Sequence, residues 1–188
     1  MSIASIVERG IRILEAKTNP FDNILIKGLM AKGISQMQLS SFIDAEDTFR
    51  RAQHITHRQL GVYNQTQLPI ISFVTATNIR QGKTFSADQQ QRFRLKVAEL
   101  NFGPESTDIL PTLVVLGSYF STRGGTIPLG AATERPLERE ILFKDAINLY
   151  ARAIKIIEIN YGTNDLRLLS PLRGMANAKM LQMTQRKQ

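Results

Sequence analysis

Two stretches of the chain, residues 145–162 (DAINLYARAIKIIEINYG) and residues 44–61 (DAEDTFRRAQHITHRQLG), share one pattern at a distance of 101 residues. Each opens on Asp-Ala, carries an aromatic residue and then an alanine at matching positions, and ends on a large apolar residue followed by glycine. Alanines seven residues apart lie on one face of a helix. The pattern therefore predicts a helix that a neighbouring helix can approach closely, ended by a glycine in the left-handed conformation.

The dipeptide of a large apolar residue and glycine occurs three times, and its spacing indicates a repeat. It is found at Leu60-Gly61, Phe102-Gly103 and Tyr161-Gly162, so the intervals are 42 and 59 residues. The longer interval exceeds the shorter by 17 residues, which is the length of the Gly- and Pro-rich stretch 123–139. We therefore expect about three units of 42 residues, the last with an insertion at 123–139 between its two helices.

The rest of the chain has the periodicity of helices rather than of strands. Apolar residues recur every three or four residues over segments that are one helix long, and short breaks separate these segments. We expect an all-α, antiparallel array of about eight helices joined by tight turns. The expected breaks are 18–23, 40–41, 61–65, 81–84, 103–107, 123–136 and 162–164.

The first helix of the third unit supplies the other half of the pattern. Its apolar and small positions are Leu113, Leu116, Gly117, Phe120 and Gly124. We expect Gly117 to lie against the small residue of the partner helix. Together with the second-helix pattern, this arrangement resembles the tetratricopeptide repeat, and the 42-residue period is similar to its kinesin-light-chain-type subclass. The resemblance covers roughly residues 21–180 and implies a right-handed α-solenoid of antiparallel helix pairs.

The resemblance implies one domain of repeats with an atypical helix at each end, as solenoids need to cover their apolar faces. The expected segments are a capping helix at 2–17, repeats at 21–61, 65–103 and 107–162, and a second capping helix at 165–185. The first unit keeps Gly33 but lacks the rest of the first-helix pattern. The middle unit departs most, because Gln91 and Arg94 stand where an aromatic residue and an alanine are expected. The chain can also be a fragment of a longer protein.

In the tetratricopeptide family, first helices line a concave groove that holds an extended peptide or a partner helix, so the resemblance implies a protein-binding module, scaffold or adaptor. The carried-over groove positions are Lys27, Met30, Ala31, Ile34, Met37, Ser72, Phe73, Ala76, Arg80, Val114, Val115, Ser118, Thr122, Arg173, Gly174 and Asn177. The array of Lys, Asn and Arg with which some members clamp a peptide carboxylate is absent. The groove is expected to be mainly apolar, which suits an amphipathic helix or hydrophobic segment. Two alternatives are that these residues are buried within the domain, and that they serve homo-oligomerisation.

Charge offers a competing interpretation. The 188 residues include 24 Lys and Arg against 16 Asp and Glu, a formal net charge of +8. A nucleic-acid-binding repeat would use a basic convex face on the second helices. Its candidate residues are Arg50, Arg51, Arg58, Arg92, Arg94, Lys96, Arg152 and Lys155. Ordinary solvated helix faces explain the same residues, and we prefer that explanation because acids lie nearby.

Catalytic and metal-binding patterns are sparse. There is no Cys and there are only two His, which excludes thiolate chemistry and leaves little for a metal site or a triad. His54 and His57 share a helix face but have no third ligand nearby, and Asp44, Glu46 and Asp47 are explained as complements to a helix dipole. We expect no enzyme activity and no cofactor. No apolar run is long enough to span a bilayer, so we expect a soluble protein, cytoplasmic or periplasmic.

Overall fold

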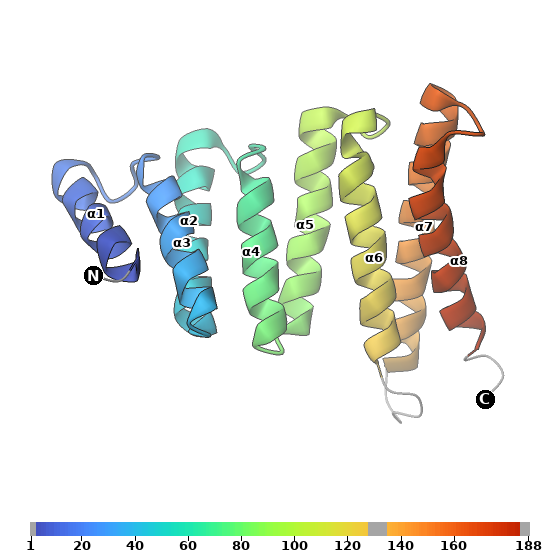
Figure 1. Cartoon of the computed structure of the whole chain (residues 1–188), viewed down its shortest axis with the longest axis horizontal. Helices are drawn as coiled ribbons and strands as arrows, with labels where there is room; N and C mark the ends of the chain where they lie inside the picture. The colour runs from blue at the N-terminus through green and yellow to red at the C-terminus, as the bar shows by residue number, and fades with distance from the viewer. Residues whose placement is uncertain (1–2, 128–134, 185–188) are drawn as a thin grey trace. The chain divides into compact units, whose positions relative to one another are not determined.

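The computed structural model describes residues 3–127 and 135–184, and within these ranges the chain is helical with no strand. The helices are numbered in chain order in Figure 1. They are α1 (Ile3–Lys17), α2 (Leu25–Gln38), α3 (Phe42–Leu60), α4 (Gln67–Arg80), α5 (Thr84–Phe102), α6 (Leu110–Thr126), α7 (Arg135–Tyr161) and α8 (Leu169–Met183). One 3₁₀ turn precedes α6 and another precedes α8. The prediction of an all-α chain of eight helices is confirmed for the described ranges.

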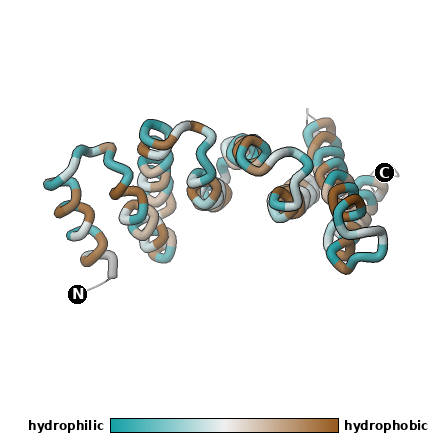
Figure 2. Tube along the Cα trace, turned by 90° about the horizontal axis from the view of Figure 1, so that it is seen from above, coloured by the Kyte–Doolittle hydropathy of each residue, from teal (hydrophilic) through white to brown (hydrophobic). Residues whose placement is uncertain are grey.

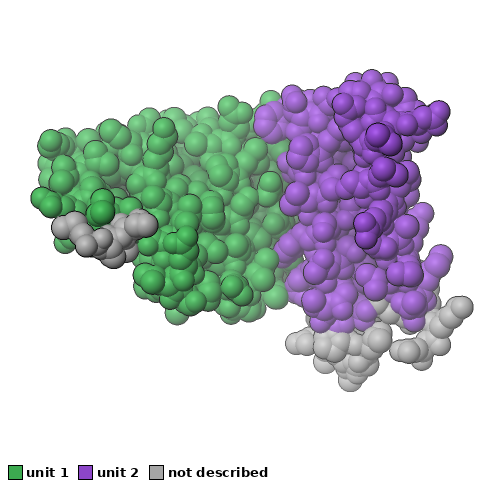
Figure 3. Space-filling view, viewed as in Figure 1, with its two compact units in different colours: residues 1–101 green, residues 102–188 purple. Residues whose placement is uncertain are grey.

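The chain divides into two compact units, residues 1–101 and residues 102–188, coloured separately in Figure 3. In the first unit α1 packs on α2, α2 on α3 and α3 on α4. In the second unit α6 packs on α7, and α8 packs on both. Each helix therefore packs on its neighbours in sequence within its unit, as in α-solenoids. Brown and teal segments alternate along the helices in Figure 2, as expected of amphipathic elements.

Glycines end the second helices as predicted. Gly61, Gly103 and Gly162 have φ angles of 100°, 89° and 92°, which a residue with a Cβ rarely adopts. Gly61 differs in detail, because its ψ of 151° is extended and outside the left-handed helical region. The apolar residue–glycine dipeptide thus marks the end of each second helix, while the exact cap geometry varies.

The alanine pattern identified in the sequence forms the centre of each unit. Ala45 and Ala52 of α3 and Ala146 and Ala153 of α7 are fully buried. The aromatic residue between each pair is also buried, with Phe49 at 0% exposure and Tyr150 at 4%. The predicted close approach of another helix is confirmed at these positions.

The partner of each aromatic ring is a glycine of the preceding first helix. A Cβ built on Gly33 would lie 2.5 Å from the Phe49 ring, and one on Gly117 would lie 2.8 Å from the Tyr150 ring. The expectation that Gly117 lies against the small residue of α7 is therefore wrong. The glycine leaves room for a flat ring, and the ring fills the space that a second small residue would leave empty.

Helix α1 covers the start of the first unit, as a capping helix should. Its Ile11 is buried against Gly28 of α2. The Glu8 carboxylate pairs with Lys32 at 3.1 Å, and the Glu15 carboxylate pairs with Arg51 of α3 at 2.6 Å. Two ion pairs on one flank of the apolar seam thus help to fix the orientation of α1 in this unit.

Both ends of the predicted 17-residue insertion at 123–139 are helical, because residues 123–126 belong to α6 and residues 135–139 belong to α7. Helix α6 continues to Thr126, and α7 begins at Arg135. Gly124 packs under the Phe143 ring, and buried Arg139 donates a hydrogen bond of 3.0 Å to the Ile127 carbonyl. The extra residues therefore lengthen both helices of the pair. Residues 128–134 lie outside the described part.

Helices α4 and α5 bury several polar side chains. Gln67, Thr75, Asn78 and Gln91 are each at most 5% exposed. Six side-chain atoms of these residues, and Nε of Arg94, have no hydrogen-bond partner among the described protein atoms. Thr75 and Gln91 are 42 residues beyond Gly33 and Phe49, so by register these two buried polar residues stand where the other pairs have the glycine–aromatic contact.

Candidate functional site: a hollow between α6 and α8

The apolar groove positions of the first compact unit (residues 1–101) are mostly packed into the protein. Met30, Ile34, Met37 and Phe73 are half-buried against the core of this unit. The Phe73 ring stacks on Phe49 with centroids 5.0 Å apart. The apolar groove expected from the sequence therefore has little exposed apolar surface here. This agrees with the alternative that these residues are buried within the domain. Lys27, Ala31 and Arg80 remain exposed, Ser72 and Ala76 are half-buried, and the Arg80 guanidinium lies 5.3 Å from the Phe42 ring centroid.

The groove positions of the second compact unit (residues 102–188) converge on one open hollow. Val114 and Ser118 of α6 and Arg173, Gly174 and Asn177 of α8 line it. Its volume is about 450 Å³, and we call it the α6–α8 hollow. All five positions were predicted from the sequence. Val115 and Thr122 are exposed on α6 but do not line the hollow.

Tyr150 of α7 forms the floor of the α6–α8 hollow. Its ring lies between Gly117 and Gly174, which face it from α6 and α8 without side chains. Burial raises the pKa of the Tyr150 hydroxyl above its ordinary value of 10.0, although a hydrogen bond with Ser118 acts in the opposite direction. The hydroxyl therefore stays protonated at neutral pH and can act as donor or acceptor.

Three lining residues were missed by sequence reasoning: Tyr150, Leu169 and Ser170. Tyr150 was assigned to the packing between helices, and it does pack there. The signal for its second role was the pair of glycines, Gly117 and Gly174, which expose one end of its ring. Leu169 and Ser170 lie in the first turn of α8, which the sequence had placed inside one longer helix from 165 to 185.

The polar groups of the α6–α8 hollow can serve an extended peptide. The Asn177 amide offers both donors and an acceptor, and the Arg173 guanidinium offers a fork of donors that fits a carboxylate. Both side chains are exposed and come from successive turns of α8. Val114 and Leu169 add apolar surface. The hollow is therefore amphipathic and basic rather than purely apolar.

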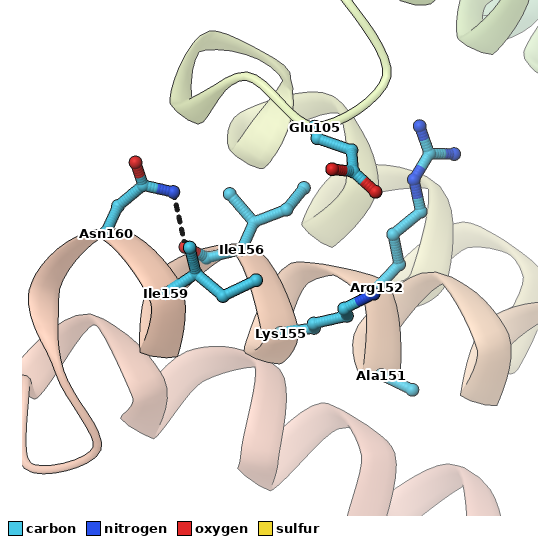
Figure 4. A pocket seen from close by; sticks show the side chains of 7 residues that line it. All are labelled: Glu105, Ala151, Arg152, Lys155, Ile156, Ile159 and Asn160. Carbon is cyan, nitrogen blue, oxygen red and sulfur yellow. Dashed lines mark hydrogen bonds between the residues drawn. The ribbon is translucent and has the colours of Figure 1, made fainter.

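A second hollow lies on the opposite side of α7 and is drawn in Figure 4. Its volume is about 320 Å³, and Ile156, Ile159 and Lys155 are among its walls. The Arg152 guanidinium in its wall donates hydrogen bonds of 2.5 and 3.2 Å to the Pro104 carbonyl. The Asn160 amide donates to the Ile156 carbonyl of the same helix at 2.8 Å. Arg152 thus holds the loop before α6 on α7, and the Asn160 bond stays within α7.

Several arginines of the proposed basic face hold the fold together. Arg50 pairs with Glu46 at 2.7 Å, Arg51 pairs with Glu15, and the Arg58 guanidinium lies 4.3 Å from the Phe21 ring centroid. Arg92, Lys96 and Lys155 are exposed. These contacts favour structural roles over a continuous basic binding surface.

Arg94 does not lie on the outer face at all, which corrects the sequence expectation. Its guanidinium donates a hydrogen bond of 2.8 Å to Ser72 of α4. Burial lowers the pKa of Arg94 below its ordinary value. The side chain thus turns into the α4–α5 interface, where repeat register places an alanine in the other units.

The two histidines form no metal site with neighbouring ligands. His54 is exposed, and half-buried His57 lies edge-on to the Phe93 ring at 5.9 Å. Burial lowers the pKa of His57, and the nearby His54 adds to the effect. Among the residues that the structure describes there is no cluster of three metal-ligating side chains. In the same ranges, no helix combines the length and apolar character needed to cross a membrane.

No protein-family model matches this sequence, and no curated protein matches it either. The structure defines an all-α protein whose helices pack in sequence order. It presents an amphipathic hollow between α6, the first helix of the α6–α7 pair, and α8, the helix that follows this pair.

Proposed function

We propose that the chain is a non-enzymatic protein-interaction module of the tetratricopeptide type, which binds a peptide segment of another protein in the α6–α8 hollow. The observation that carries the proposal is the convergence of five sequence-predicted positions, Val114, Ser118, Arg173, Gly174 and Asn177, on that hollow. A scaffold or adaptor role follows from such a module when it joins its partner to another protein.

The chemistry of the hollow favours a short extended segment over a long apolar helix. An extended peptide has free backbone N–H and C=O groups, which an asparagine amide can pair with. Arg173 favours a carboxylate close to that backbone. The apolar positions of the first unit that would have held a hydrophobic helix pack against its core instead.

Selection from a random peptide library on the immobilised protein tests the proposal. We expect enrichment of peptides that combine an acidic residue with an apolar one. Asn177→Ala should weaken the selected peptides at least about tenfold, which corresponds to about 1.4 kcal/mol. Asn148→Ala is the matched control, because Asn148 is an exposed helical asparagine of α7 that does not line the hollow.

Two results would overturn the proposal. One is a selection that enriches no peptide above the background of an unrelated protein. The other is a set of peptides whose affinities change equally in Asn177→Ala and Asn148→Ala. Binding of generic oligonucleotides that weakens steeply with salt would instead support the basic-face alternative.

A further inference from the structure

Helix α8 carries an exposed apolar stripe along its whole length. Leu169, Leu172, Met180 and Met183 are 66%, 42%, 57% and 64% exposed, and Ala176 between them is exposed as well. Their spacings of three, four, four and three residues place them on one helix face. We call these five residues the α8 stripe.

The α8 stripe lies on the side of the helix that faces away from its own unit. The opposite side holds the buried residues Pro171 and Ala178. Gly174 on that side packs on the Tyr150 ring. Helix α8 is thus fixed by one face. The stripe borders the α6–α8 hollow at Leu169, while its other four residues do not line the hollow.

The start of α8 repeats the start of α6. The Ser106 side chain accepts a hydrogen bond from the Asp108 N–H, and the Asp165 side chain accepts one from the Arg167 N–H. One 3₁₀ turn follows in each case, and the α-helices then begin at Leu110 and Leu169. The two helices therefore correspond at an offset of 59 residues, the interval between Gly103 and Gly162.

The correspondence between α8 and α6 shows which element covers the equivalent stripe of α6. The residues of α6 that correspond to the α8 stripe are Leu110, Leu113, Gly117, Ser121 and Gly124. Leu110 is half-buried, the other four are buried, and Gly117 and Gly124 meet the Tyr150 and Phe143 rings of α7. Helix α8 therefore exposes the face that α6 covers with a second helix.

The charges of α8 indicate which kind of helix would pack on the stripe. Helix α8 contains Arg173 and Lys179 and no acidic residue. At 100° per residue these two cations lie on either side of the stripe. A helix packed on the stripe would bring its flanking positions next to them, and carboxylates there would be attracted while cations would be repelled.

We propose that the α8 stripe receives an amphipathic α-helix of a partner protein, which carries an apolar or aromatic seam flanked by Asp and Glu and packs antiparallel on α8 as α7 packs on α6. This surface adjoins the peptide site proposed above at Leu169 and Arg173, and it is tested at Met180 and Met183, which do not line the hollow.

A labelled synthetic peptide provides the probe. It has the sequence of residues 139–161, the segment that covers α6, with its Lys and Arg replaced by Glu. Wild-type protein should bind it, and Met180→Glu and Met183→Glu should each weaken binding at least about tenfold. Both methionines are more than half exposed, so these variants should keep the circular dichroism spectrum of the wild type.

Two lysine-to-glutamate variants test the role of charge. Lys179→Glu should weaken the acidic peptide about threefold and strengthen the unmodified peptide that keeps its Lys and Arg. Lys144→Glu, the same change at an exposed lysine of α7, should alter neither affinity. Asn177→Ala should also leave this binding intact, so failure of the peptide site and failure of the stripe are distinguishable.

Four results would overturn the proposal. The first two are no binding of the acidic peptide by the wild type, and equal binding by Met180→Glu. The third is concentration-dependent self-association in sedimentation that Met180→Glu abolishes, since the occupant would then be a second copy. The fourth is adsorption to phosphatidylserine-containing vesicles that Met180→Glu abolishes without any peptide binding, since the occupant would then be a membrane.

Discussion

The ring of Tyr150 lies against Gly117 so closely that a Cβ on that glycine would come within 2.8 Å of the ring carbon Cζ. This contact joins the two helices of the α6–α7 pair and also sets the floor of the α6–α8 hollow. The equivalent contact of Gly33 with Phe49 in the first unit shows that it belongs to the repeat.

Gly117→Ala should destabilise the protein because the new methyl group overlaps a fixed ring. Overpacking of this kind costs about 1–3 kcal/mol. Chemical denaturation followed by circular dichroism measures the change. Gly125→Ala in the same helix is the control, because a Cβ there meets only Leu181 at 4.0 Å, and it should stabilise by up to about 1 kcal/mol. Equal effects of the two substitutions would contradict the proposed packing.

The burial and register of Thr75 and Gln91 predict that a glycine–aromatic contact can be introduced between α4 and α5. Thr75→Gly with Gln91→Phe should unfold at higher denaturant concentration than either single variant. The single variants should be neutral or destabilising, because one lacks the ring and the other lacks space for it. A favourable coupling free energy of about 1 kcal/mol or more is expected.

A matched substitution separates packing from simple hydrophobicity in that experiment. Gln89→Phe introduces the same ring at an exposed position of α5 and should show no coupling with Thr75→Gly. Additive effects of Thr75→Gly and Gln91→Phe would show that the middle pair does not share the register of the other two.

Glu46 should make the protein acid-sensitive. Its side chain is 6% exposed, and burial opposes its ionisation. Hydrogen bonds from Lys83, Arg50 and Gln81 outweigh burial, so the pKa lies below its ordinary value of 4.5. Because the folded state holds this proton less tightly than the unfolded state, the contribution is present above pH 4.5 and is lost as pH falls through the folded pKa.

Glu46→Gln should therefore destabilise the protein by about 1–3 kcal/mol near neutral pH, and the difference from the wild type should shrink in acid. Denaturation at a series of pH values measures it. Asp47→Asn makes the same charge change at an exposed neighbour and serves as control. A difference that stays constant down to the acid limit would contradict the assigned role.

Two groove positions that look equivalent in the sequence, Phe73 and Val115, should respond differently to substitution by Asp, because only Phe73 packs against the core. Phe73→Asp should destabilise by at least about 2 kcal/mol, because it removes the stack on Phe49 and places a charge against the core. Val115→Asp should change stability by less than about 0.5 kcal/mol, because Val115 is 45% exposed. Similar losses in thermal denaturation would mean that the two residues share one environment.

The sequence predicted the helix boundaries well because glycine and helical periodicity act locally. Gly61, Gly103 and Gly162 need positive φ angles wherever the rest of the chain lies. It did not predict that residues 123–126 and 135–139 are helical, because glycine and proline suggested a loop there. The Gly124–Phe143 contact and the Arg139 bond to Ile127, which depend on tertiary packing, lie in these two segments and beside them.

The candidate site was predicted in position but not in chemistry. The resemblance to the tetratricopeptide repeat implied Ser118, Arg173 and Asn177 as groove positions, and all three line the same hollow in the structure. Whether Phe73 faces solvent or Phe49 depends on helix spacing, which a single sequence does not contain. The inward turn of Arg94 toward Ser72 has the same origin, since it required knowing which neighbours leave room for a guanidinium.

The absence of cysteine from the chain permits the most direct test of the peptide-binding claim. A single Ser170→Cys variant, labelled with an environment-sensitive fluorophore, reports on the rim of the α6–α8 hollow, and labelled Asn148→Cys reports on a surface away from it. Titration with a library-selected peptide should change the emission at position 170, with half-saturation at the dissociation constant of the unlabelled protein, and leave position 148 unchanged. A change at position 148 with none at position 170 would contradict the account.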